Sequence, residues 1–212
     1  MEYSIRRETE SDERIVEEIT RKAFWDVHFP GCNEHYLAHM LRKSNDFIPE
    51  LDLVISTNSA IIGNIMYTRS YILNTENHRM DTITFGPVSI LPGYQKRGLG
   101  SLLISHSIEK AKEMGFPAII IFGNPHDYCK YGFYGSKRYG IGIMGNKYPC
   151  ALLVKPLIGN SIPHGLWDFF ESKAYEINDE EFESFDKSFD QVDKKYRYSQ
   201  EEFNILSHSF VE

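Results

Sequence analysis

The spacing of apolar residues divides the chain into alternating strands and helices. Apolar positions at helical spacing predict helices over residues 11–24, 33–42 and 99–114. Gly115 and Pro117 end the third and longest of these helices. Runs rich in β-branched and aromatic residues predict strands over residues 3–6, 51–57, 60–68, 81–91 and 118–123. Asn58 and Ser59 join two of these strands as a hairpin, so the first two thirds of the chain has the mixed pattern of an α/β domain.

The pattern changes in the last quarter of the chain. A short helical turn is expected over residues 126–131, followed by β-like runs over residues 140–144 and 151–157. From about Gly159 the composition shifts, and residues 168–193 are rich in Asp and Glu, which favours a solvated helix face. Aromatic residues in the same region argue against disorder. We therefore expect a core over residues 1–157 and, over residues 158–212, an acidic, aromatic-containing C-terminal extension packed on that core.

Composition and charge narrow the class of protein. The 212 residues carry a net charge of −7, which argues against a nucleic-acid partner and is compatible with a cationic small-molecule or peptide substrate. No apolar run approaches the ~20 residues that span a membrane, and the charged N-terminus lacks the features of a signal peptide. The sequence thus predicts a cytoplasmic protein without a membrane partner. Its three isolated cysteines offer neither a disulfide framework nor a CxxC metal pair.

One loop, "PGYQKRGLGSLL" at residues 92–103, carries the pattern of a phosphate-binding site. A P-loop would need Lys and Ser or Thr where this chain has Leu99 and Gly100. A dinucleotide-binding turn would need a third glycine at Leu103 and an acidic residue after the next strand, and both are missing. Neither nucleotide motif therefore describes the loop.

A third pattern fits the same loop. Gln95, Gly98 and Gly100 form Q-x-x-G-x-G directly between a strand and the long helix. Consecutive backbone N–H groups at such a helix start form a nest for an anion, and glycine removes the Cβ that would hold a diphosphate away. Lys96 and Arg97 add positive charge at the rim.

The stretch from Phe85 to Phe133 resembles the central motifs of the GNAT superfamily of N-acetyltransferases, and most closely its YhbS-type branch. The matching pieces are "GPVSILP", the Gln95 loop, the long helix, the apolar strand and "YCKYGF". The resemblance covers roughly residues 1–157. It implies the GNAT acetyltransferase fold, an α/β architecture with a mixed, splayed central sheet flanked by helices, here with a C-terminal extension. Tyr131 stands where the family often has Phe.

The resemblance also implies a co-substrate and the residues that would hold it. Acetyl-CoA would be bound without any metal. Backbone groups of Val88 and Ile90 would face the pantetheine arm and the thioester carbonyl, and Asn124 would stand near the arm. The diphosphate would lie on the loop made of Gln95, Lys96, Arg97, Gly98, Leu99, Gly100 and Ser101. Tyr128 aligns with the family's usual general acid, which gives a proton to the departing thiolate, and Tyr131 and Tyr134 are the alternatives.

The expected activity is transfer of an acetyl group from acetyl-CoA to a primary amine by direct attack. The acceptor, a small-molecule or peptide amine, stays open, and so does a homodimer. The general base is open among Glu34, Asp46, Glu50, His126 and Asp127. His28, His35 and His39 lack a further ligand for zinc. A function of a different class, a non-catalytic acyl-CoA-binding sensor or partner-binding module, would use the same loop and differ only in turnover.

Overall fold

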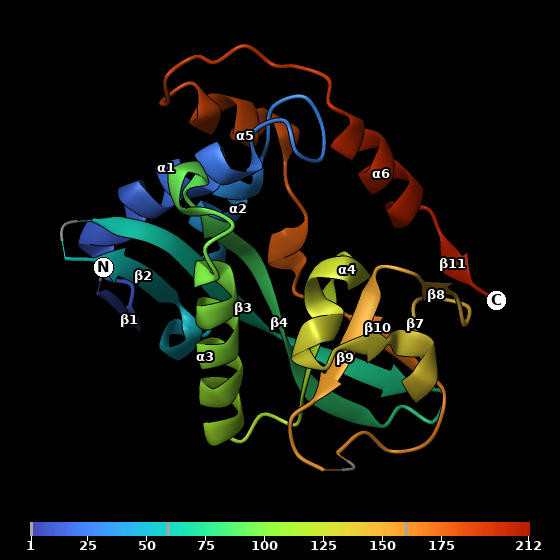
Figure 1. The fold of residues 1–212 in the computed structure, drawn as a ribbon. Coiled ribbons are helices and arrows are strands. Elements are labelled where there is room, and N and C mark those ends of the chain that lie inside the picture. The colour runs from blue at the N-terminus through green and yellow to red at the C-terminus, as the bar shows by residue number, and fades with distance from the viewer. Residues whose placement is uncertain (1, 59, 160) are drawn as a thin grey trace.

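The computed structural model describes residues 2–58, 60–159 and 161–212 as a mixed sheet with helices on both faces (Figure 1). The strands are β1 (Tyr3–Arg7), β2 (Leu53–Thr57), β3 (Ile61–Asn74), β4 (Arg79–Ile90), β5 (Ala118–Phe122), β6 (Tyr134–Gly135), β7 (Ile141–Gly142), β8 (Tyr148–Pro149), β9 (Leu152–Pro156), β10 (Trp167–Phe170) and β11 (Phe210–Val211). The helices are α1 (Glu13–Phe24), α2 (Glu34–Leu41), α3 (Leu99–Glu113), α4 (Pro125–Tyr128), α5 (Asp179–Asp186) and α6 (Tyr198–Ser207).

The main sheet has the strand order β1-β2-β3-β4-β5-β9-β6, and β10 adds to the far end of β3 and also pairs with β7. Along the main path every pair is antiparallel except β4 with β5. That parallel pair needs a crossover, and α3 supplies it between the two strands. This is the mixed, helix-flanked sheet that the family resemblance predicts.

Alternation along β3 explains why helices cover both faces. Ile65 and Tyr67 are buried in the cluster that contains α3 residues such as Leu103. Met66, between them, is buried on the other face with Ala38 and Leu41 at α2. Successive side chains of a strand point to opposite faces, so a strand that is apolar at every position needs cover on both. Figure 1 shows α3 lying along one face of the sheet, opposite the side that carries α1 and α2.

Most predicted elements lie within a few residues of the observed ones, with three differences. β3 continues to Asn74, beyond the predicted residue 68, because it pairs with β4 as far as Leu73 opposite Arg79. Ser59, predicted for the hairpin turn, lies outside the described residues. β10 and α5 occupy the acidic run, where no strand was expected.

The acidic run is not simply a solvated face. Asp186 of α5 accepts a hydrogen bond from Arg21 Nε at 2.8 Å and lies 3.0 Å from His35 Nε2. Burial lowers the pKa of His35 to about 4, so this ring is neutral at physiological pH and Arg21 balances the Asp186 charge. His35 also contacts the Phe189 ring, with centroids 4.9 Å apart. The expectation of a solvated helix is therefore wrong on this side of α5, which is attached to α1 and α2.

Beyond α5 the chain crosses the turn between α1 and α2 and returns to the opposite end of the molecule (Figure 1). The Lys195 N–H donates to Asp26 Oδ1 at 3.1 Å, and β11 pairs with β8. The extension thus contributes β10 to the main sheet and connects both ends of the core.

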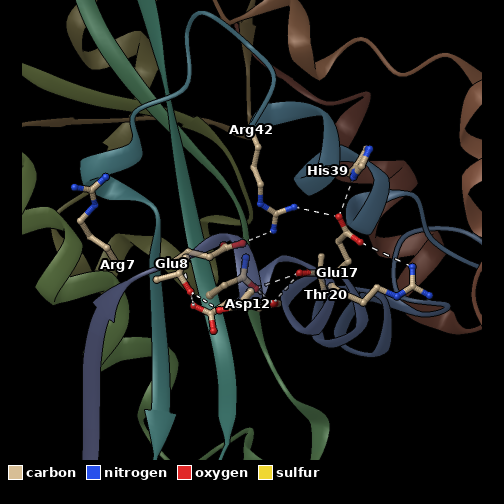
Figure 2. Close-up of polar contacts among 12 residues, drawn as sticks. Arg7, Glu8, Asp12, Glu17, Thr20, His39 and Arg42 are labelled. Carbon is tan, nitrogen blue, oxygen red and sulfur yellow. Dashed lines mark hydrogen bonds and ion pairs between the residues drawn. The ribbon is translucent and has the colours of Figure 1, made fainter.

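A network of buried charges joins β1, α1 and α2 (Figure 2). Arg42 lies 2.6 Å from Glu8 and 3.1 Å from Glu17, and both carboxylates are nearly inaccessible to solvent. Asp52 lies beside Glu8, and burial together with the Glu8 charge raises the pKa of Asp52 to about 9. The Glu8–Asp52 pair therefore holds a proton on Asp52 at neutral pH, and Arg42 neutralises Glu8.

Candidate active site

The carboxyl-terminal half of β4 separates from β5. The two strands have one pair in register, Ile83 with Ile119, and beyond it β4 pairs only with β3. The register between β3 and β4 also shifts between Ile65 and Tyr67, which bends β4 at that point. The sheet therefore opens between β4 and β5, as the resemblance predicts for a splayed sheet.

The backbone of Val88 and Ile90 faces this opening. Leu91 N–H donates to Ile62 O, so the groups of Leu91 point toward β3. Backbone groups alternate in direction along an antiparallel strand, so those of Val88 and Ile90 point the other way. Ile90 O accepts a hydrogen bond from Gln95 Nε2 at 2.9 Å on that side. The Val88 and Ile90 side chains pack against the main core, so core packing and an open backbone edge coexist here.

The loop after β4 ends in a row of free amides. In the part of the chain that the structure describes, no backbone N–H from Lys96 to Ser101 donates to a protein acceptor. Gly98 is the N-cap of α3 with φ +81°, a left-handed conformation that glycine adopts without strain. The first turn of α3 has no acidic residue, and the side chains of Lys96 and Arg97 are exposed beside it. These groups suit an anion such as a diphosphate.

The other loop residues have different surroundings. The Leu99 side chain is buried in the core, so only its backbone can face a ligand. A Cβ added at Gly100 would lie 3.6 Å from an Ile90 side-chain carbon, which is ordinary contact. Ser101 Oγ accepts the Tyr131 hydroxyl at 2.8 Å. Gln95 acts through its bond to Ile90, which fastens the loop to the end of β4.

Tyr128 lies at the end of α4, beyond β5. Its ring packs on Phe85 of β4 and on Phe133, with centroids 5.6 and 6.1 Å apart. A Cβ at Gly123 would come within 2.6 Å of the Tyr128 ring, so only glycine at 123 leaves room for the ring in this position. Burial raises the pKa of Tyr128, and its hydroxyl binds no described residue. Tyr128 is thus a neutral phenol with a free proton beside the separated strands.

The alternative tyrosines are placed differently. The Tyr131 hydroxyl is engaged by Ser101. Tyr134 is exposed in β6, and the Arg138 guanidinium lies 4.3 Å from the centre of its ring. Asn124 is the N-cap of α4, and its side-chain oxygen accepts the His126 N–H at 3.0 Å, which leaves its NH₂ group for other partners.

The candidate bases are scattered. Glu34 lies 2.7 Å from His28 Nδ1, and Glu50 is exposed in the turn before β2. His126 and Asp127 are exposed on α4. Asp46 accepts a hydrogen bond from Ser172 Oγ at 2.7 Å, which joins it to the C-terminal extension. The structure does not gather these five residues into one site.

The sequence interpretation missed a segment that reaches β4. Tyr175 donates its hydroxyl to Gly86 O at 3.2 Å, two residues before Val88, across 89 positions of the chain. No local pattern marks this contact, since the segment resembles its acidic surroundings. Among residues 2–58, 60–159 and 161–212, no helix has the length and apolar composition needed to cross a bilayer. Within the same ranges no group of three or more His, Cys, Asp or Glu side chains could hold a metal ion.

Comparison with known proteins gives the family. A family model described as "Acetyltransferase (GNAT) family" matches residues 17–134. The uncharacterized N-acetyltransferase YjhQ of Escherichia coli K12 is 26% identical over 123 residues, which are 58% of this chain and 65% of that relative. The chain thus spans slightly less than two thirds of that relative's length.

Solved structures show the same fold. The GNAT family N-acetyltransferase YhbS of Escherichia coli, crystallised with CoA, superposes with a TM-score of 0.69 at 18% identity, over 82% of this chain and 92% of that one. A GNAT family acetyltransferase from Brucella melitensis, crystallised with acetyl-CoA, gives a TM-score of 0.65 at 21% identity, over 82% and 98%. The predicted fold class is confirmed.

Proposed function

Because this chain belongs to the GNAT acetyltransferase family, we propose that it transfers an acetyl group from acetyl-CoA to a primary amine. One observation carries the proposal. The free amides of residues 96–101 and the open backbone edge of β4 are joined at one end of the sheet by the bond from Gln95 to Ile90. Two solved relatives with the same fold contain CoA or acetyl-CoA, which supports the choice of co-substrate.

The loop and the strand edge would divide the binding of acetyl-CoA between them. Backbone N–H groups from Lys96 to Ser101 would hold the diphosphate, and the Lys96 and Arg97 side chains would add positive charge. The backbone of Val88 and Ile90 and the free NH₂ group of Asn124 would bind the pantetheine arm. The N–H of Val88 would also stabilise negative charge that develops on the thioester oxygen.

Tyr128 would then act as the general acid. Its hydroxyl has no protein partner among the described residues, and burial raises its pKa, so it carries its proton at neutral pH. A phenol in this position can give that proton to the departing sulfur when the carbon–sulfur bond breaks. Tyr131 is less suited, because its hydroxyl already binds Ser101.

A substrate screen tests the activity. Wild-type protein with saturating acetyl-CoA and a panel of amines, covering polyamines, aminoglycosides, amino acids and peptide N-termini, should release free CoA with at least one of them. The thiol reagent assay measures that release. Tight CoA binding by calorimetry with no turnover on any amine would instead support the non-catalytic binding module and would overturn the enzymatic proposal.

Replacing Tyr128 with phenylalanine tests the acid. We expect kcat to fall about tenfold or more with little change in the KM for acetyl-CoA, because the ring packing survives and only the proton donor is lost. Tyr134→Phe is the matched control and should leave kcat unchanged, since Tyr134 is exposed in β6. An unchanged kcat in the Tyr128 variant would give the role to another residue or to water.

A further inference from the structure

The segment that follows β10 places an unpaired carboxylate beside the opening between β4 and β5. Phe170 pairs with Tyr71 of β3, and Ser172 donates its hydroxyl to Asp46 at 2.7 Å. The chain then forms a 3₁₀ turn over Lys173–Tyr175 that packs on the α2 face of the sheet. Because both ends of this short segment are fixed, Glu171 is held close to the core strands.

Tyr175 shows which part of β4 the segment approaches. Its hydroxyl donates to Gly86 O at 3.2 Å, at the point where β4 has left β5. Burial raises the pKa of Tyr175, and the Glu171 charge adds to this rise, so the two side chains are within electrostatic reach. Tyr67 is influenced in the same way by both Tyr175 and Tyr128. The C-terminal segment and α4 therefore approach the same part of β3 and β4.

Glu171 has no structural partner. Within the residues that the structure describes, its carboxylate forms no hydrogen bond and no ion pair, and its side chain is reached by solvent. A carboxylate that stabilised the fold would bind a cation or a backbone N–H, as Asp186 and Glu17 do. Glu171 instead keeps its oxygens available for a molecule from outside.

We infer that Glu171 is the general base of the acetyl transfer and binds the acceptor as a cationic primary amine. This inference rests on the proposed function and assigns a role that none of the five candidates from the sequence fills. The carboxylate accepts one proton from the ammonium group, so that the nitrogen lone pair can attack the thioester carbon. A carbon–nitrogen bond forms and the carbon–sulfur bond breaks.

The protons balance across the two residues. Tyr128 protonates the departing sulfur, and the second proton of the amine nitrogen returns to Tyr128. Glu171 releases its proton to solvent, so each turnover yields acetylated amine, CoA and one proton. The surroundings suit this task, since burial and the Glu176 charge raise the pKa of Glu171 to about 7. The other titratable neighbours are Tyr175 on the same segment and Asp46, which binds Ser172. A base that titrates near the working pH can accept a proton and release it in the same cycle.

Glu171→Gln tests the assignment, with the best amine from the panel as the probe. We expect kcat at pH 7.5 to fall about 100-fold, with unchanged KM for acetyl-CoA and unchanged CoA affinity by calorimetry. In wild type, kcat should fall as the pH drops below about 7, and this acidic limb should disappear in the variant. The profile of kcat is the one to use, because the free amine also titrates and alters kcat/KM.

Two further variants sharpen the test. Glu176→Gln removes the negative neighbour, so the acidic limb should move to lower pH while kcat at pH 7.5 is kept. Glu183→Gln, on the exposed side of α5, is the matched control and should change neither kcat nor its pH profile. Unfolding midpoints of all three variants check that the fold is kept, and the Glu176 variant tests the assignment even if the Glu171 variant does not fold.

The outcomes separate the two proposals. No transfer by wild type to any amine would overturn the proposed function and this inference with it. Transfer by wild type with an unaltered kcat in Glu171→Gln would overturn only the role of Glu171. A lower kcat that keeps its acidic limb would also overturn that role, since the limb would then belong to another group.

Discussion

Replacing Gly100 with glutamate should abolish the binding of CoA. Gly100 is the second residue of α3, within the row of free amides, and a Cβ there would meet only an Ile90 side-chain carbon at 3.6 Å. The fold should tolerate the change, because an acidic residue in the first turn of a helix is favourable. The new carboxylate would occupy and neutralise the nest that the diphosphate requires.

The expected loss of affinity is at least about 100-fold, since two charge-assisted hydrogen bonds contribute about 1.5–3 kcal/mol each. Calorimetry with CoA measures it directly. Ser105→Glu adds the same charge on the exposed side of α3 and should leave the affinity unchanged. If the Gly100 variant bound CoA as tightly as wild type does, the loop would not be the diphosphate site.

Replacing Arg42 with leucine should destabilise the protein by about 3–5 kcal/mol, because it leaves buried carboxylates without their cation. Arg42 lies 2.6 Å from Glu8 and 3.1 Å from Glu17, and Asp52 adds a third acidic group (Figure 2). Urea unfolding followed by circular dichroism measures the change. Such a loss is a large part of the total stability of a domain of this size.

Arg7→Leu is the matched control for that variant. Arg7 is exposed and its Nε donates to Pro49 O at 3.0 Å, so its loss should cost only about 0.5–1.5 kcal/mol. If the two leucine variants were equally stable, Arg42 would not balance the buried acids.

Asp52→Asn tests the same network through its dependence on pH. The pKa of Asp52 in the folded protein is about 9, above its ordinary value of 3.8, so the folded state holds more protons between these limits. The stability that this proton provides is present at low pH and is lost as the pH rises toward 9. Asparagine needs no proton there, so the variant should gain stability relative to wild type between pH 5 and pH 9. A constant difference across this range would mean that Asp52 is ionised throughout.

The C-terminal extension links cofactor binding to the choice of acceptor. The loop at the start of α3 can hold CoA whatever the acceptor is, because it reads only the diphosphate. Tyr175 and Glu171 approach β4 from residues beyond the family match at 17–134. A family member with a different extension would therefore keep the same co-substrate and present other groups to the amine.

The sequence by itself determined the features that depend on neighbouring residues. Apolar spacing placed α1, α2 and α3 to within a few residues, because each turn of a helix is set by contacts three or four positions apart. The anion-binding loop was also visible, since Gly98 and Gly100 act through their own backbone. These interactions lie within short windows of the chain.

Only the tertiary structure decided the features that depend on distant contacts. The opening between β4 and β5 follows from pairing that stops after Ile83 and Ile119, and no local pattern records where pairing ends. Tyr128 and Tyr131 look alike in sequence, but Ser101, 30 residues from Tyr131, engages only the latter. The contact from Tyr175 to Gly86 spans 89 residues and places Glu171 near the site. The physical reason is that the environment of each of these groups is supplied by residues far away along the chain, which come together only when the core packs.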